Sequence, residues 1–104
     1  MSIYGEWLAA TIALNGTSSA AVNLGKDCDF LEIQIPTVTS CTLGLQVSEK
    51  LAGTYDDLGE GVTTDTTTGS YFDVWKLGGW RYIKVVSSAT QGAERLIRVR
   101  GMAQ

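Results

Sequence analysis

The side chains in this chain that could do chemistry are thiols, hydroxyls, amines and carboxylates, because the sequence contains no histidine. A serine or cysteine nucleophile usually needs a neighbouring base, which only a lysine or a carboxylate could supply here. Paired carboxylates can hydrolyse glycosides, but a β-domain of 104 residues offers little room for a deep cleft. The sequence therefore predicts a protein that is not an enzyme and that has no cofactor.

The two cysteines, Cys28 and Cys41, are the candidates for a disulfide or a metal site. The strand pattern described below places them at opposite ends of a hairpin, about 23 Å apart at about 3.3 Å per residue. That separation is too large for a disulfide, so we expect two free thiols. Without a histidine or a CxxC pair, a zinc site is not expected.

Carboxylates gather in two places along the chain. Asp27 and Asp29 precede one predicted strand, and Asp56, Asp57 and Glu60 lie close together further on. Clustered carboxylates on loops can bind calcium, which takes six to eight oxygen ligands. The spacing does not match an EF-hand, and solvated turns explain such residues as well. We therefore predict no metal site.

Aromatic and basic residues gather in the C-terminal part of the chain: Tyr71, Trp75, Trp80, Tyr82, Arg81, Lys84, Arg98 and Arg100. Alternation turns Tyr82 and Lys84 outward on one predicted strand, and Arg98 and Arg100 outward on another. If these strands are neighbours, one face presents all four side chains. Such a face suits a protein interface, a sugar or single-stranded nucleic acid, and an ordinary solvated sheet would also carry it.

Charge is divided along the chain. Residues 1–75 carry ten acids and two bases, whereas residues 76–104 carry six bases and one acid. The two parts can pair internally, or they can give oppositely charged surfaces that attach to neighbouring copies. The net charge of −3 and the isoelectric point near 4.7 argue against a nucleic-acid partner.

The first eight residues stand apart from the rest. Tyr4, Trp7 and Leu8 are apolar groups on a segment with no obvious pairing partner. Residues 1–8 are therefore interpreted as an arm that docks on a neighbouring molecule or covers the end of its own domain, residues 9–104. No secretory signal and no apolar run near the length of a membrane span is present. We expect no membrane partner and synthesis in the cytosol.

The clearest strands are residues 30–35 and 41–47, which both alternate with period two. Folding one on the other puts Ile35 opposite Cys41 and Ile33 opposite Leu43 on one face. Because a one-residue slip would send every apolar side chain to solvent, we predict a hairpin here.

Further strands are expected at residues 8–14, 20–24, 70–75, 80–87 and 94–100, with a shorter one at 55–58. Asn15 and Gly16 fit a hairpin turn, and residues 59–69 fit a long loop or an irregular edge. Six to eight strands about ten residues apart predict an all-β fold, a single antiparallel β-sandwich, with a jelly-roll topology as one way of connecting the strands.

Three segments carry a resemblance to a known group of proteins. They read QVSEK at 46–50, GTYDDL at 53–58 and GWRYIKV at 79–85, and a last strand, RLIRVR at 95–100, alternates arginine with aliphatic residues. This pattern resembles small β-sandwich structural proteins of tailed bacteriophages over about residues 20–100. The resemblance implies a virion component, of the capsid decoration (cement) type or the tail accessory type.

The chain has no heptad stalk or repeat that would trimerise a fibre shaft, which favours the decoration type. The resemblance then implies a place on the outer capsid surface, the major capsid protein or other virion proteins as partners, and a homo-oligomer, a trimer being one form. The candidate interface residues are Tyr4, Trp7, Leu8, Tyr82, Lys84, Arg98 and Arg100. The alternative is a carbohydrate-binding accessory domain of a tail, baseplate or fibre, with Trp75, Trp80 and Tyr82 stacking on sugar rings.

Overall fold

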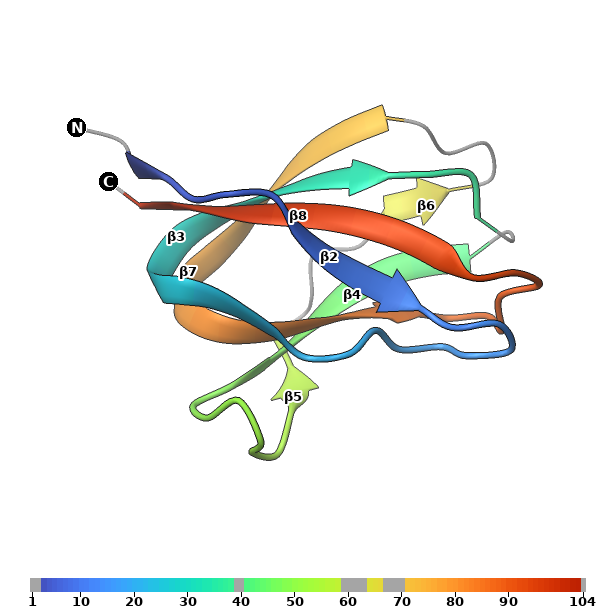
Figure 1. Cartoon of the computed structure of the whole chain (residues 1–104), viewed down its shortest axis with the longest axis horizontal. Helices are drawn as coiled ribbons and strands as arrows, with labels where there is room; N and C mark the ends of the chain where they lie inside the picture. Colours follow the sequence, from blue (N-terminus) through green and yellow to red (C-terminus); the bar gives the residue numbers. More distant parts are fainter. Residues whose placement is uncertain (1–2, 39–40, 59–63, 67–70, 104) are drawn as a thin grey trace.

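A computed structural model describes residues 3–38, 41–58, 64–66 and 71–103 of the chain (Figure 1). Eight strands run along the described part of the chain. Their bounds are β1 Ile3–Tyr4, β2 Leu8–Ile12, β3 Val22–Ile35, β4 Cys41–Ser48, β5 Asp56–Asp57, β6 Thr64–Thr66, β7 Tyr71–Ser87 and β8 Arg95–Ala103. Every pairing between these strands is antiparallel, and no helix is present in the described ranges. The predicted all-β antiparallel fold is confirmed.

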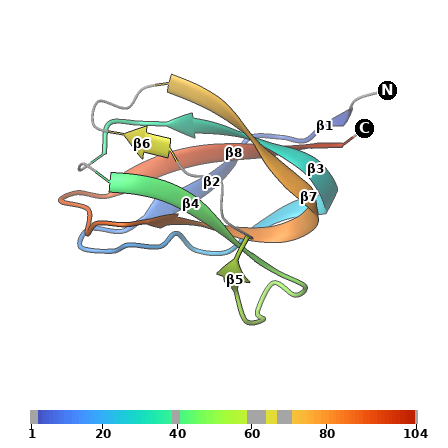
Figure 2. The same cartoon turned by 180° about the vertical axis from the view of Figure 1, so that it is seen from behind.

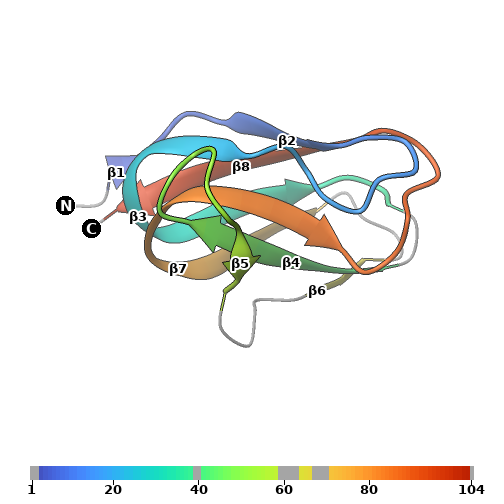
Figure 3. The same ribbon diagram turned by 90° about the horizontal axis from the view of Figure 1, so that it is seen from below.

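All the strands belong to one hydrogen-bonded sheet. Its order is β1-β8-β3-β7-β4-β5, while β2 also pairs with β8 and β6 also pairs with β4. The sheet folds back on itself, so that β2 and β8 lie on one side of the molecule and β4 with the second half of β7 on the other (Figures 2 and 3). We call the part around β8 the first layer and the part around β4 the second layer.

The two longest strands, β3 and β7, pass from one layer to the other through paired bends. Gly78 and Gly79 of β7 have φ angles of 77° and 98°, and Gly25 of β3 has a φ of 87°. These left-handed conformations suit glycine, which has no Cβ to clash. The register between β3 and β7 shifts between Asn23 and Cys28 at the same level. The predicted strands 70–75 and 80–87 are therefore two halves of one bent strand.

The core lies between the two layers. Alternate residues of β3, β4, β7 and β8 point into it, as the buried positions of Ile33, Leu43, Val85 and Val99 show. The other face of each strand carries polar and charged residues together with several exposed apolar ones. Alternation thus defines the buried face of each strand as predicted.

The predicted hairpin of residues 30–35 and 41–47 is wrong, although both segments are strands. Residues 30–35 of β3 pair with β7 and β8, and β4 pairs with β5, β6 and the second half of β7. Ile33 lies opposite Asp73 and Val99, whereas Leu43 lies opposite Ser87 and Thr64. The two segments line the core from different layers, an arrangement that needs the same alternation as a hairpin does.

The remaining strand predictions agree with the structure apart from their ends. The segment predicted as 8–14 ends at Ile12, and 20–24 joins the start of β3. Gly16 N–H donates to the Ala13 carbonyl at 2.8 Å, and Asn15 has a φ of 65°, so a turn is present. It does not join a hairpin as predicted, because β2 pairs with β8 and meets the segment after the turn at an isolated bridge between Ile12 and Ser19. Within the predicted loop 59–69, residues 64–66 form β6, and the others lie outside the described residues.

Both cysteines are buried free thiols, as predicted. Burial is the main cause that raises the pKa of the Cys28 thiol above its ordinary value, so it stays protonated at neutral pH. We expect neither thiol of the native protein to react with Ellman's reagent at pH 7.5 within minutes, and both to react in guanidinium chloride. Rapid reaction of Cys28 in the native protein would contradict the packing around it.

Candidate functional site

The first candidate site is the outer surface of the first layer, where outward side chains of β7, β3 and β8 form rows across three neighbouring strands. In one row Val74 lies opposite Glu32, which lies opposite Arg100. The next row joins Phe72, Gln34 and Arg98 in the same way. Each row therefore runs from an apolar residue on β7 to an arginine on β8.

Trp7, which lies between β1 and β2, packs over these rows. Its ring centre lies 4.8 Å from the guanidinium carbon of Arg100 and 5.3 Å from that of Arg98. The Trp7 and Phe72 ring centres are 5.9 Å apart, with planes tilted by 54°. Cations near an indole face are attracted by its negative charge density, and tilted aromatic pairs are favourable. Trp7 thus connects the arginines to the apolar end of the face.

Hydrogen bonds orient the two arginines. Arg100 Nε donates to Glu32 Oε1 at 2.6 Å, and Arg98 Nη1 donates to Gln34 Oε1 at 3.3 Å. Because both arginines are held from the side by β3 and contacted by Trp7, they lose fewer conformations on binding than free surface arginines would. Both guanidinium groups are therefore held in defined positions on this surface.

Three large apolar side chains remain exposed on this same surface. Phe72 is 61% exposed, Val74 52% and Leu96 54%. A cluster of exposed apolar groups next to aromatic residues and arginines is typical of protein interfaces. We call the surface formed by Trp7, Phe72, Val74, Leu96, Arg98 and Arg100 the Trp7 face.

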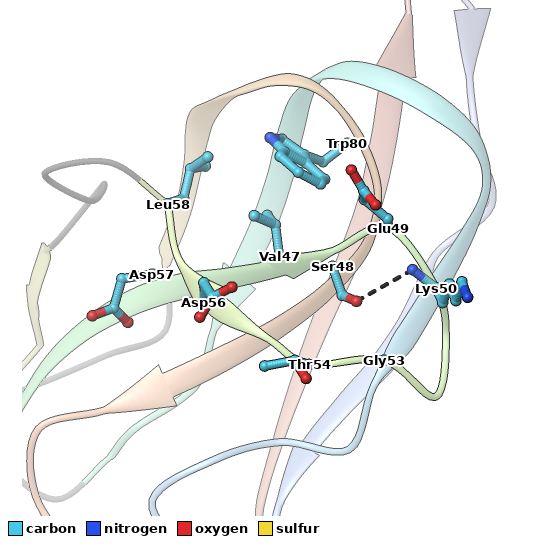
Figure 4. Close-up of a pocket in the computed structure, with 10 residues that line it drawn as sticks. All are labelled: Val47, Ser48, Glu49, Lys50, Gly53, Thr54, Asp56, Asp57, Leu58 and Trp80. Atoms are coloured by element: carbon cyan, nitrogen blue, oxygen red, sulfur yellow. Dashed lines mark hydrogen bonds between the residues drawn. The ribbon is translucent and has the colours of Figure 1, made fainter.

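The second candidate site is a depression beside the β4–β5 connection, shown in Figure 4. Two adjoining hollows, of about 460 and 340 Å³, share the residues Ser48, Glu49 and Trp80. The larger is completed by β4, β5 and their connection, and the smaller by Asp27, Arg81 and Tyr82. We call the two hollows together the Trp80 groove.

The Trp80 groove combines apolar walls with carboxylates. Val47 and Leu58 line the larger hollow, and Trp80 is half-buried and packs against the core. Glu49 and Asp56 stand around the same hollow (Figure 4). Asp57 accepts a hydrogen bond from Gln46 Nε2 at 3.3 Å, and its carboxylate points away from Trp80 (Figure 4). The groove therefore offers a negative and partly apolar environment to a ligand.

The structure divides the predicted group of outward residues between the two layers. Arg98 and Arg100 belong to the Trp7 face, whereas Tyr82 and Lys84 lie on the half of β7 that pairs with β4. Lys84 stacks over the Tyr55 ring at 4.7 Å, and burial, with a smaller effect of Tyr82, raises the pKa of the Tyr55 phenol. One surface that presents all four side chains is not formed, because β8 does not pair with this half of β7.

The N-terminal residues lie along β8 of the same chain. Ile3 and Tyr4 pair with Ala103 and Met102, and Gly5 N–H donates to the Gly101 carbonyl at 2.9 Å. Leu8 is half-buried and packs against the core, while the side chain of Tyr4 is outside the described residues. Their role in an interface stays a prediction, as does that of the other five candidate residues.

Phe72, Val74 and Leu96 were missed by the sequence reasoning. The signal was present, because Trp75 and Ile97 point inward and alternation then turns all three outward. Apolar residues at outward positions of β7 and β8 are the pattern that would have identified the Trp7 face.

The described residues do not contain three or more acidic or cysteine side chains grouped to hold a metal ion. Asp27 lies by the smaller hollow and Asp56 by the larger, and Glu60 is outside the described residues. In the same described ranges, no helix reaches the length and apolar character of a membrane span.

The sequence matches no family model and no curated protein. Several solved structures are similar. The SPBc2 prophage-derived protein YomS superposes with a TM-score of 0.64 at 12% identity, over 99% of this chain and 96% of that one. The Yersinia pseudotuberculosis-derived mitogen gives 0.50 at 11% identity, over 100% of this chain and 88% of that one. At these identities the likeness shows a shared fold.

A third similar structure is the C-terminal domain of A223, a structural protein of Sulfolobus turreted icosahedral virus. It has a TM-score of 0.47 at 12% identity, over 95% of this chain and 98% of that domain.

Proposed function

We propose that this chain is a non-enzymatic virion structural protein of the decoration type, which attaches to the outer capsid surface through the Trp7 face. The observation that carries the proposal is the exposure of Phe72, Val74 and Leu96 beside Trp7 and two oriented arginines. Aromatic and arginine side chains contribute most of the binding energy at protein interfaces. A face of this composition suits a partner with apolar and acidic groups.

A decoration protein can attach through a modest face. A protein that covers a capsid is present in many copies on a repeating surface, so each contact can be modest when neighbouring copies reinforce it. The proposal includes a homo-oligomer that assembles on the capsid, and light scattering of the purified protein tests whether it forms beforehand. The shared fold with a prophage-derived protein and the resemblance in residues 20–100 are both compatible with this role.

Mass spectrometry and immunogold electron microscopy of phage particles, induced from the strain that encodes this chain, test the proposal. We expect the chain in purified particles and the gold label on the capsid. Gold label confined to the tail would mean that the protein attaches to the tail and not to the capsid. Absence of the chain from the particles would refute the virion role.

A variant pair tests the Trp7 face itself. Phe72→Ser removes an exposed ring from the face, while Leu14→Ser removes a similarly exposed apolar side chain, 58% against 61%, in the turn after β2. On particles prepared without this protein, we expect Phe72→Ser to bind about tenfold more weakly than wild type and Leu14→Ser to bind normally. Equal loss in both variants would mean that the binding does not depend on this face.

The alternative function is carbohydrate binding by an accessory domain, and the Trp80 groove is the observation that favours it. Trp80 and Tyr82 both line the smaller hollow, but Trp75 is only 2% exposed and cannot stack on a sugar. A glycan array with wild type and Trp80→Ala tests carbohydrate binding, provided that the variant unfolds at the same temperature as wild type. Binding that Trp80→Ala abolishes would support it, and an array without binding would exclude the glycans tested.

A further inference from the structure

We propose that the Trp80 groove is a second binding site, which takes a basic side chain, arginine or lysine, from an extended segment of a partner protein. This proposal goes beyond attachment through the Trp7 face and does not depend on it, because the two surfaces share no residue. The shape of the groove, its charge and its apolar walls support the proposal.

The shape of the groove suits an extended ligand. Its two hollows meet at Ser48, Glu49 and Trp80, so a chain crossing the groove would pass over the indole. The combined space falls in the range of ligand sites, and it is open to solvent. Ser48 is 5% exposed, and its Oγ accepts the Lys50 N–H at 3.2 Å. The Ser48 O–H finds no acceptor within the described residues, so it can donate to a peptide carbonyl.

The charge of the groove suits a cation. Glu49 lines both hollows together with Trp80, and Asp56 lines the larger one from β5 (Figure 4). Neither carboxylate has an ion-pair partner in the part of the chain that the structure describes. The two basic residues of the lining form no ion pair with these carboxylates in the described part of the chain. Arg81 donates to Asn23 Oδ1 at 3.1 Å and stacks on Tyr82, and Lys50 points away from the indole. A guanidinium or ammonium over the indole would gain from both the ring and the carboxylates.

The apolar walls distinguish a basic side chain from the other cationic ligands. Val47 and Leu58 line the larger hollow together with the Trp80 indole. Lysine and arginine have aliphatic stems that can pack on such walls while the charged end reaches Glu49 or Asp56. A neutral sugar can stack on the indole but carries no charge to pair with Glu49 or Asp56. Calcium requires six to eight oxygens and gains nothing from apolar walls.

Nuclear magnetic resonance of the whole chain tests the proposal. The probe is the acetylated and amidated peptide Gly-Ser-Arg-Ser-Gly, with citrulline in place of arginine as the neutral control. The chain has three tryptophans, so three indole N–H signals are expected, and Trp80→Phe identifies the one that belongs to the groove. We expect the arginine peptide to shift the Trp80 signal and the citrulline peptide to leave it unchanged at the same concentration.

Isosteric variants test the carboxylates. We expect Glu49→Gln to weaken binding of the arginine peptide about threefold, and the double variant Glu49→Gln/Asp56→Asn about tenfold, as partly exposed ion pairs do. Glu94→Gln makes the same change of charge outside the groove and should bind within about twofold of wild type. These variants replace oxygen by nitrogen in exposed side chains, so they should fold normally.

Three results would overturn the proposal. The first is equal binding of the citrulline peptide, and the second is unchanged affinity in the double variant. The third is a glucosamine tetramer that shifts the Trp80 signal at lower concentration than the arginine peptide, which would assign the groove to a cationic sugar. A loss of particle binding in Phe72→Ser does not affect these readings, because that variant changes the other surface.

Discussion

Replacing Trp75 with alanine is expected to lower the free energy of unfolding by about 4 kcal/mol, a large effect for one substitution. Trp75 is 2% exposed and is the largest buried side chain among the described residues. Its Nε1–H donates to Asp73 Oδ2 at 3.0 Å, so truncation also removes one of the hydrogen bonds to that carboxylate, which keeps the one from Val74 N–H. Guanidinium chloride unfolding, followed by circular dichroism, measures the change.

Trp7→Ala is the matched control for Trp75→Ala, because it removes the same side chain from the surface. Trp7 is half-buried and packs on arginines and on the exposed Phe72, so we expect a loss of about 1 kcal/mol. The same variant should weaken attachment to particles, which Trp75→Ala cannot test if it unfolds. A Trp7→Ala loss as large as that of Trp75→Ala would mean that Trp7 belongs to the core.

Gly101→Ala is expected to cost about 2 kcal/mol of unfolding free energy, although it adds only one methyl group. Gly101 is a buried residue of β8 that lies opposite Leu31. An added Cβ would overlap Cys28 Sγ, would lie 3.1 Å from Cys28 Cβ and would touch Leu24. The bent part of β3 therefore packs directly against the backbone of β8. An added methyl group would have to displace the side chain of Cys28 or the bend that carries it.

A double-mutant cycle separates this overlap from a general effect of altering β8. Cys28→Ala removes the sulfur that an alanine at position 101 would meet first. The double variant should lose at least 1 kcal/mol less than the sum of the two single losses, since the sites are in contact. Additive losses would show that the cost of Gly101→Ala comes from elsewhere.

Alternation in the sequence predicted the buried face of each strand but not its neighbours. The residues expected inside β3, such as Leu31 and Ile33, are fully buried, and so are Leu43 and Leu45 of β4. A period of two fixes only which side of a strand faces the core, and two strands that face each other across a core satisfy it equally well. The hairpin was wrong for this reason, because pairing depends on where the chain crosses between layers.

The bends in β3 and β7 explain why the candidate site was predicted only in part. Gly78 and Gly79 read as a turn between two strands, whereas they bend one strand into both layers. That bend separates Tyr82 and Lys84 from the arginines of β8. The outward direction of Arg98 was predictable from alternation. Its contacts with Trp7 join residues 91 positions apart, and no local pattern reports them.

Internal ion pairing between the acidic residues 1–75 and the basic residues 76–104 accounts for only part of the charge division along the chain. Arg100 of the basic part does pair with Glu32 of the acidic part. Asp27, Glu49 and Asp56 instead stand around the Trp80 groove. The two parts of the sequence thus contribute to two surfaces of different character, one with arginines and one with carboxylates.

The pairing of β2 with β8 has a consequence for how the chain folds. Leu8 lies beside Val99 and Ile12 beside Arg95. Strand β2, near the start of the chain, therefore cannot pair before β8, near its end, has been synthesised. Because β3 and β4 do not form a local hairpin, much of the sheet also depends on distant partners. High contact order of this kind slows folding into the millisecond to second range. During synthesis the first layer cannot close until β8 has left the ribosome, so the exposed edge of β3 needs protection from aggregation until then.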